Sequence, residues 1–204
     1  MGMKQRSLLC LATVALYLLA IVSAQAADMK LESGDPSPLK GAGAVNVRYV
    51  YDGMMVDKET EAAYVKRAVA GEEKGGAGKG DKWLKLWTES RVGRYQPRFE
   101  RELNNVLKKK GVTFSSSQSA AKYTLILRTV MCDPGWAGWG LIRKSSRTDA
   151  VATLVETAKP NAVLATIRVY DCGGNGGDYN LAGRVEATYS TCGKELGHFL
   201  KKSL

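Results

Sequence analysis

The sequence has few of the residues from which metal and redox sites are built. It contains one histidine, His198, and four cysteines, none of them in Cys-x-x-Cys spacing. Zinc sites and thioredoxin-like sites need clustered ligands or that spacing, so neither is expected. No Gly-x-Ser-x-Gly elbow and no His-Glu-x-x-His helix motif is present either. The sequence therefore gives no sign of a hydrolase or metalloprotease centre, and we expect no cofactor.

Two glycine-rich stretches resemble ligand-binding loops without completing their motifs. The stretch 71–80 has Glu73 and Gly80 where a phosphate-binding loop requires Gly and then Ser or Thr. A loop begun at Asp171 has Gly173 and Ala182 where a calcium-binding EF-hand requires Asp or Asn and then Glu. Both stretches are interpreted as flexible connections.

The amino end has the pattern of a secretory signal peptide. Lys4 and Arg6 precede an apolar run over residues 8–22, and Ala24-Gln25-Ala26 follows it. We predict a signal peptide over residues 1–26, cleaved near Ala26, and a periplasmic or secreted mature protein. The run is short for a membrane span, although an uncleaved anchor is the alternative. No comparable apolar run follows, so no transmembrane segment is expected in the mature chain.

The formal net charge is +10 and stays strongly positive when Lys4 and Arg6 are removed. A basic protein often binds nucleic acid, but an exported protein rarely meets any, so no nucleic-acid partner is expected. Anionic lipid, anionic polysaccharide or an envelope protein fits the charge better. Solubility alone is the competing interpretation.

The rest of the chain predicts one α+β domain over residues 45–204, behind a flexible lead-in at 27–44 rich in Gly and Pro. Three consecutive strands between Ala121 and Asp171 form an antiparallel meander, in which a short turn over residues 158–162, containing Pro160-Asn161, joins the last two strands. We expect one mixed, largely antiparallel sheet of about five strands, with helices mainly on one face. The predicted strands are 45–51, 112–114, 121–131, 150–157 and 163–171, and the predicted helices are 59–70, a segment from Asp81, 97–110 and 183–204.

The cysteines after residue 26 are Cys132, Cys172 and Cys192, and an odd number cannot all pair within one chain. Cys132 and Cys172 both follow strands, so a bridge between them is conceivable. Cys192 lies on the apolar stripe of the last helix, where a free cysteine acts as a small hydrophobic residue. The pairing stays open.

A long connection between the first two strands of the meander holds the candidate binding residues Trp136, Trp139, Arg143, Lys144 and Arg147. Connections of this length are functional or disordered. Indoles beside positive charge suit a protein partner or anionic head groups. Alternatively, the indoles fold back on the edge of the sheet. The triplet Lys108–Lys110 is interpreted more simply as the end of a helix.

The pattern Phe99-x3-Leu103-x3-Leu107-x3-Gly111, the strand from Ala121 and the final helix with Leu196-Gly197-x2-Leu200 resemble small bacterial envelope proteins and lipoproteins. These are similar to the amino-terminal domain of the Tol translocation protein and to the curli-secretion lipoprotein. The resemblance implies an envelope location and a protein-binding or assembly role. We predict a non-catalytic binding or assembly module that contacts a protein or an anionic envelope component. An envelope enzyme is the alternative.

Overall fold

The computed structural model describes residues 27–138, 143–174 and 180–204. The predicted meander is present as β6 (Tyr123–Asp133), β9 (Arg147–Glu156) and β10 (Lys159–Gly173), with β9 antiparallel to both neighbours. The turn is two residues long and ends before Lys159, so its predicted position at Pro160-Asn161 is wrong. Pro160 lies inside β10, where the pairing with β9 is irregular between Lys159 and Val163. Proline, which cannot donate to a ladder, is tolerated at such an irregularity.

The sheet has eight strands and follows the order β1-β10-β9-β6-β2-β5, with β3 beside β6 and β4 beside β3. β2 runs parallel to both β5 and β6, whereas the strands from β6 to β1 are antiparallel. The predicted class, a mixed and largely antiparallel α+β sheet, is confirmed. The remaining strands are β1 (Asp28–Gly34), β2 (Gly43–Val50), β3 (Met55–Val56), β4 (Glu59–Thr60), β5 (Val112–Ser115) and the separate pair β7 (Trp136–Ala137) and β8 (Arg143–Lys144).

The predicted flexible lead-in at 27–44 contains an edge strand, β1, and that part of the prediction is wrong. β1 pairs antiparallel with β10, and Met29 lies opposite Val169. Met29 thereby packs against the hydrophobic core. Gly34 ends the strand at φ +75, and a Cβ there would lie 2.0 Å from the carbonyl oxygen of Leu164. The glycine at this position therefore permits a close backbone approach.

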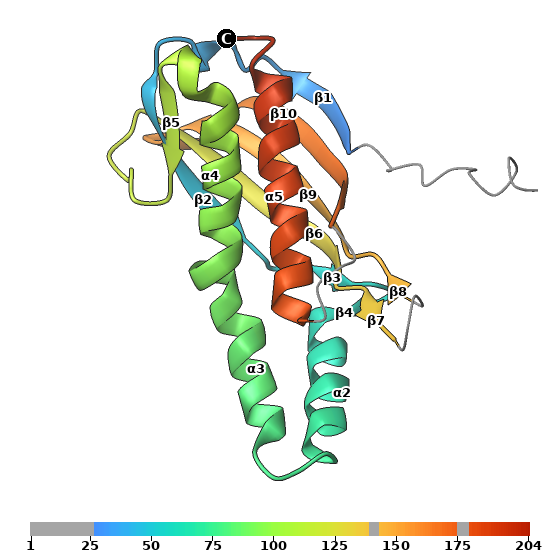
Figure 1. The fold of residues 1–204 in the computed structure, drawn as a ribbon. Coiled ribbons are helices and arrows are strands. Elements are labelled where there is room, and N and C mark those ends of the chain that lie inside the picture. Colours follow the sequence, from blue (N-terminus) through green and yellow to red (C-terminus); the bar gives the residue numbers. More distant parts are fainter. Residues whose placement is uncertain (1–26, 139–142, 175–179) are drawn as a thin grey trace, which may run out of the picture.

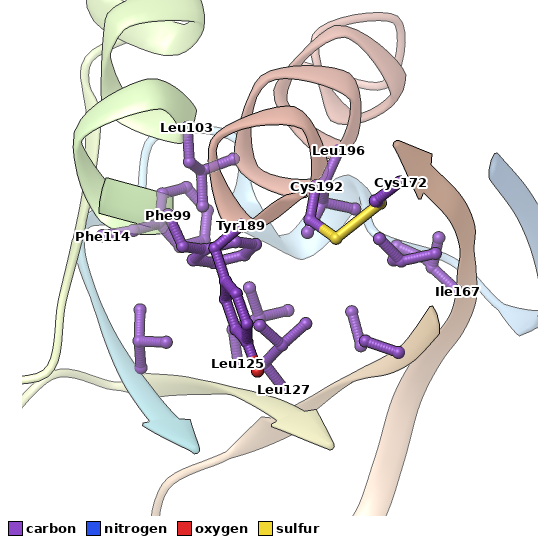
Figure 2. Packing of buried hydrophobic residues seen from close by; sticks show 14 of the residues in the cluster. Phe99, Leu103, Phe114, Leu125, Leu127, Ile167, Cys172, Tyr189, Cys192 and Leu196 are labelled. Carbon is purple, nitrogen blue, oxygen red and sulfur yellow. A yellow bond between two sulfur atoms is a disulfide. The ribbon is translucent and has the colours of Figure 1, made fainter. Parts of the chain in front are cut away.

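Two helices, α4 (Gln96–Leu107) and α5 (Leu181–Leu200), lie side by side over one face of the sheet (Figure 1). Phe99, Leu103 and Leu107 of α4 are fully buried. Burying such a side chain stabilises a fold by about 1.5–3 kcal/mol each. Figure 2 shows Tyr189 of α5 reaching from the helix layer down to the sheet, where its hydroxyl lies 2.7 Å from that of Thr129. The core therefore lies between this helix pair and the sheet, as predicted.

A helical hairpin formed by α2 (Glu61–Glu73) and α3 (Lys79–Ser90) extends past the end of the sheet (Figure 1). No residue of α2 is fully buried, which agrees with its narrow apolar stripe. The helix predicted from Asp81 begins two residues earlier, because the Glu73 carboxylate accepts hydrogen bonds from the backbone N–H groups of Gly78 and Gly80. The chain does not break at Gly93 but continues into α4 through a π-helical turn, η2 (Arg91–Tyr95).

The disulfide joins Cys172, near the end of β10, to Cys192 of α5 (Figure 2). The interpretation of Cys192 as a free core residue is therefore wrong. Cys132 is the free cysteine among the described residues, and it is buried. Sequence spacing did not reveal this pairing, because it depends on the angle at which α5 crosses β10.

Candidate functional site

The predicted binding loop is a small hairpin in which Trp136 pairs with Lys144 and Ala137 with Arg143. Trp136 is 48% exposed, so its indole does not fold fully back onto the sheet. Arg143 is exposed and forms no ion pair with any residue that the structure describes. Trp139 lies outside the described residues.

The other two basic residues of this loop are held by carboxylates. Lys144 Nζ lies 2.6 Å from Asp133 Oδ2 and 3.2 Å from Asp57 Oδ1. Hydrogen bonds to Asp133 and then Asp57 raise the pKa of Lys144 above its ordinary value. Arg147 lies 2.9 Å from Asp171 and 3.7 Å from Asp149. The loop therefore presents an exposed indole and one unpaired arginine, with its other positive charges neutralised.

A different positive surface is created by the packing of α4 against α5. The two helices run parallel: Gly193 of α5 meets the backbone of Phe99, and Gly197 meets Val106 and Leu103 further along α4. Parallel helices in contact finish at the same end of the molecule. The residues that follow them, in η3 (Lys108–Lys110) and after Leu200, are consequently brought together (Figure 1).

A third segment reaches the same end through the sheet. β2 pairs parallel with β5 so that Gly43 lies beside Val112, and the chains entering these strands come from Lys40 and Lys110. We call the resulting surface the lysine end. It comprises Lys40, Lys108, Lys109, Lys110, Lys201 and Lys202, of which all but the half-buried Lys110 are exposed.

The lysine end carries unbalanced charge. Within residues 27–138, 143–174 and 180–204 none of its lysines lies within ion-pair distance of a carboxylate side chain. Glu102, the nearest acidic residue before the lysine triplet, is engaged by Arg98 and Arg101. The carboxylate of Asp35 accepts two hydrogen bonds from Ser37, which lower its pKa. Sequence reasoning assigned the triplet to a helix terminus and could not see that other lysines join it.

The described residues show little sign of a reactive centre. Burial raises the pKa of the Cys132 thiol to about 12, so the thiol is protonated at neutral pH. Two Ser-x-x-Lys matches, which sequence reasoning missed, begin at Ser37 and Ser119. The Ser37 hydroxyl donates to Asp35, and Lys122 lies over the Tyr123 ring, so neither pair forms a serine–lysine hydrogen bond. No group of three or more His, Cys, Asp and Glu side chains suited to a metal ion occurs in the described part of the chain.

A comparison with solved structures finds distant similarity of overall fold. The PelC dodecamer from Paraburkholderia phytofirmans is 10% identical, with a TM-score of 0.40 over 82% of this chain and 96% of that chain. A structure of a variant PelC dodecamer from the same organism is 12% identical, with a TM-score of 0.36 over 81% of this chain and 97% of that chain. No protein-family model and no curated protein matches the chain.

None of the helices in the described ranges is both long enough and apolar enough to cross a lipid bilayer.

Proposed function

We propose that the protein is an exported, non-catalytic module that docks on anionic lipid head groups of the cell envelope through its lysine end. The observation that carries this proposal is the convergence of unpaired lysines from separate segments on one end of a closely packed helix pair. Such a surface matches a plane of phosphate groups, because several of its ammonium groups can approach the plane together.

The carboxyl ends of the helices account for only part of this charge. Each helix presents about half a negative charge at its carboxyl end. The carboxyl ends of two parallel helices therefore offset the positive charge of roughly one lysine, and the lysine end contains several further lysines. A basic residue near an anionic membrane contributes about 1 kcal/mol to binding, so the unpaired lysines together suffice for a stable contact at low salt.

The disulfide supports an extracytoplasmic location. Cys172–Cys192 is the kind of crosslink that persists in oxidising compartments and is rare in the cytosol. It agrees with the signal peptide predicted over residues 1–26, which lies outside the described residues. The protonated, buried Cys132 thiol supports a non-catalytic role, because a nucleophilic cysteine must form a thiolate.

The hairpin loop is proposed as a secondary contact, with Trp136 and Arg143 as the residues that touch a partner. Trp139 belongs to the same proposal from the sequence alone. Lys144 and Arg147 act within the loop, because Asp133 and Asp171 hold them in place. This contact suits an envelope protein better than a polyanion, since it offers an indole and little free charge.

The test is flotation of the mature protein with vesicles of phosphatidylcholine alone or mixed with phosphatidylglycerol. We expect binding only to the anionic vesicles, and binding that weakens as salt is added. The variant Lys109→Gln/Lys201→Gln/Lys202→Gln should bind roughly a hundredfold more weakly, at about 1 kcal/mol per lysine.

The matched control is Lys66→Gln/Lys74→Gln/Lys82→Gln, which removes the same charge from exposed positions on the α2–α3 hairpin. It should bind within about threefold of the wild type, because the hairpin lies at the other end of the molecule (Figure 1). Equal losses in both variants would contradict a localised site. Tighter binding to soluble polygalacturonate than to anionic vesicles, at equal charge concentration, would replace lipid by polysaccharide as the partner.

A further inference from the structure

A second candidate site lies at the base of the helical hairpin, independent of the lysine end. A cleft of about 310 Å³ opens between the turn after β2, the β3–β4 pair and the start of α2. Its volume is at the lower end of the range for small-molecule sites. The lining residues on which the inference rests are Tyr51, Asp52, Met54, Met55, Glu61 and Arg91.

The polar wall of the cleft is formed by side chains that contact one another. The Arg91 guanidinium stacks over the Tyr51 ring at 4.4 Å and forms an ion pair with Glu61. The Glu61 carboxylate also accepts a hydrogen bond of 2.7 Å from the Trp87 indole N–H. Arg91 uses one of its donor nitrogens in the ion pair, and a guanidinium has five N–H groups. Donors and acceptors are therefore both available at this wall.

Behind this wall is a small chamber of about 10 Å³, which shares Tyr51, Met54 and Arg91 with the cleft. Tyr95 lines the chamber and is only 3% exposed, and among the described residues its hydroxyl makes no hydrogen bond of good geometry. A buried hydroxyl without a partner costs about 1–3 kcal/mol. The chamber is just large enough for one water-sized group, which would satisfy it.

The π-helical turn accounts for the joint placement of Arg91 and Tyr95. Both belong to η2, and residues four apart in such a turn lie on nearly the same side of the helix. π-helical turns are rare and often mark functional positions. In this protein the turn places a cation at the wall of the cleft and an unpaired hydroxyl behind it.

The charges around the cleft favour a neutral ligand. An anion would face Asp52 and Glu61, and a cation would face Arg91. A molecule with many hydroxyl groups can donate to the carboxylates and accept from the guanidinium, while an apolar face lies on Met54 and Met55. We propose that this cleft binds a neutral sugar residue, one hydroxyl of which reaches the Tyr95 hydroxyl when Arg91 shifts.

The test uses amide and indole NMR spectra of the mature protein titrated with methyl glucoside, methyl galactoside or methyl N-acetylglucosaminide. We expect saturable shifts of the Trp87 indole N–H and of the Gly53 amide for at least one of these probes. The charged probes glucosamine and glucuronate should bind at least tenfold more weakly. The variant Tyr95→Phe should remain folded, with an unchanged or higher melting temperature, and bind the neutral probe about tenfold more weakly.

Two variants distinguish sugar binding in this cleft from sugar binding elsewhere on the surface. Asp52→Asn/Met55→Ala changes only the outer wall and should also weaken binding at least tenfold. The lysine-end variant should leave the sugar-induced shifts unchanged. The sugar-binding inference and the proposed membrane contact are therefore tested independently. Absence of saturable shifts with every neutral probe, or equal affinity for the charged probes, would overturn the inference.

Discussion

Gly197 of α5 lies so close to Val106 of α4 that a Cβ added at Gly197 would come within 2.8 Å of the Val106 Cβ. One turn earlier, a Cβ at Gly193 would lie 2.3 Å from the carbonyl oxygen of Phe99. The two helices therefore approach each other through small residues. These contacts hold α4 and α5 close together in the parallel arrangement whose common end carries the lysine end.

Replacing Gly193 with alanine should destabilise the protein by about 1–3 kcal/mol, because the helices must move apart to admit the methyl group. This penalty outweighs the gain of up to about 1 kcal/mol in helix propensity. Gly71→Ala in α2 is the control, since a Cβ there meets nothing within 4 Å. Urea unfolding measures both variants, and a Gly193→Ala protein as stable as Gly71→Ala would contradict the packing described.

Loss of the disulfide should lower the free energy of unfolding by about 3 kcal/mol, as expected for a loop of this size. The bridge joins residues 20 apart in sequence. Adding a reductant should reduce the urea midpoint of the wild type and leave Cys172→Ala/Cys192→Ala unchanged. A wild-type midpoint insensitive to reductant would show that the bridge does not form.

The Cys132 thiol should be unreactive towards thiol reagents in the folded protein and reactive in urea. Burial raises its pKa from 9.0 to about 12. Because the folded state holds this proton more tightly than the unfolded state, its stabilising effect is complete below about pH 9 and is lost as pH rises towards 12. Cys132→Ala should therefore show a shallower loss of stability over that range. Rapid labelling of native protein at neutral pH would contradict the burial.

Neutralising the loop cations should affect vesicle binding little. Lys144→Gln/Arg147→Gln is expected to stay within about threefold of the wild type, since these charges are already paired with aspartates. The same substitutions should make the hairpin more mobile, which relaxation of the Trp136 indole signal would report. A loss of vesicle binding as large as that of the lysine-end variant would indicate that this loop, and not the lysine end, makes the main contact.

Local sequence patterns were sufficient to predict much of the fold. Alternation in residues 121–171 predicted the meander, and the spacing of Phe99, Leu103 and Leu107 predicted the buried face of α4. β1 was missed because Gly34 ends it and the segment after it is rich in Gly and Pro, while its stability comes from pairing with a distant strand. The sequence marks such an edge strand only weakly, through Met29 and Leu31.

The site was harder to predict, because its charges are set by residues far apart in sequence. Lys144 is neutralised in part by Asp57, 87 residues away. Lys108–Lys110 and Lys201 follow the ends of α4 and α5, and the parallel packing of these helices places both ends at the same end of the molecule. Neither relationship has a local signature, so the sequence alone did not show that Lys144 and Arg147 are paired with aspartates, or that lysines from separate segments lie at one end of the molecule.

If the chain is exported as proposed, the pairing of β1 with β10 governs when it completes its fold. Asp28 of β1 and Arg168 of β10 form an ion pair across 140 residues of sequence. The first strand to emerge from a membrane channel therefore has no partner until nearly the whole polypeptide has crossed. Contacts of such long sequence separation form slowly. In the proposed export, the sheet would therefore be completed only after nearly the whole chain had crossed the membrane.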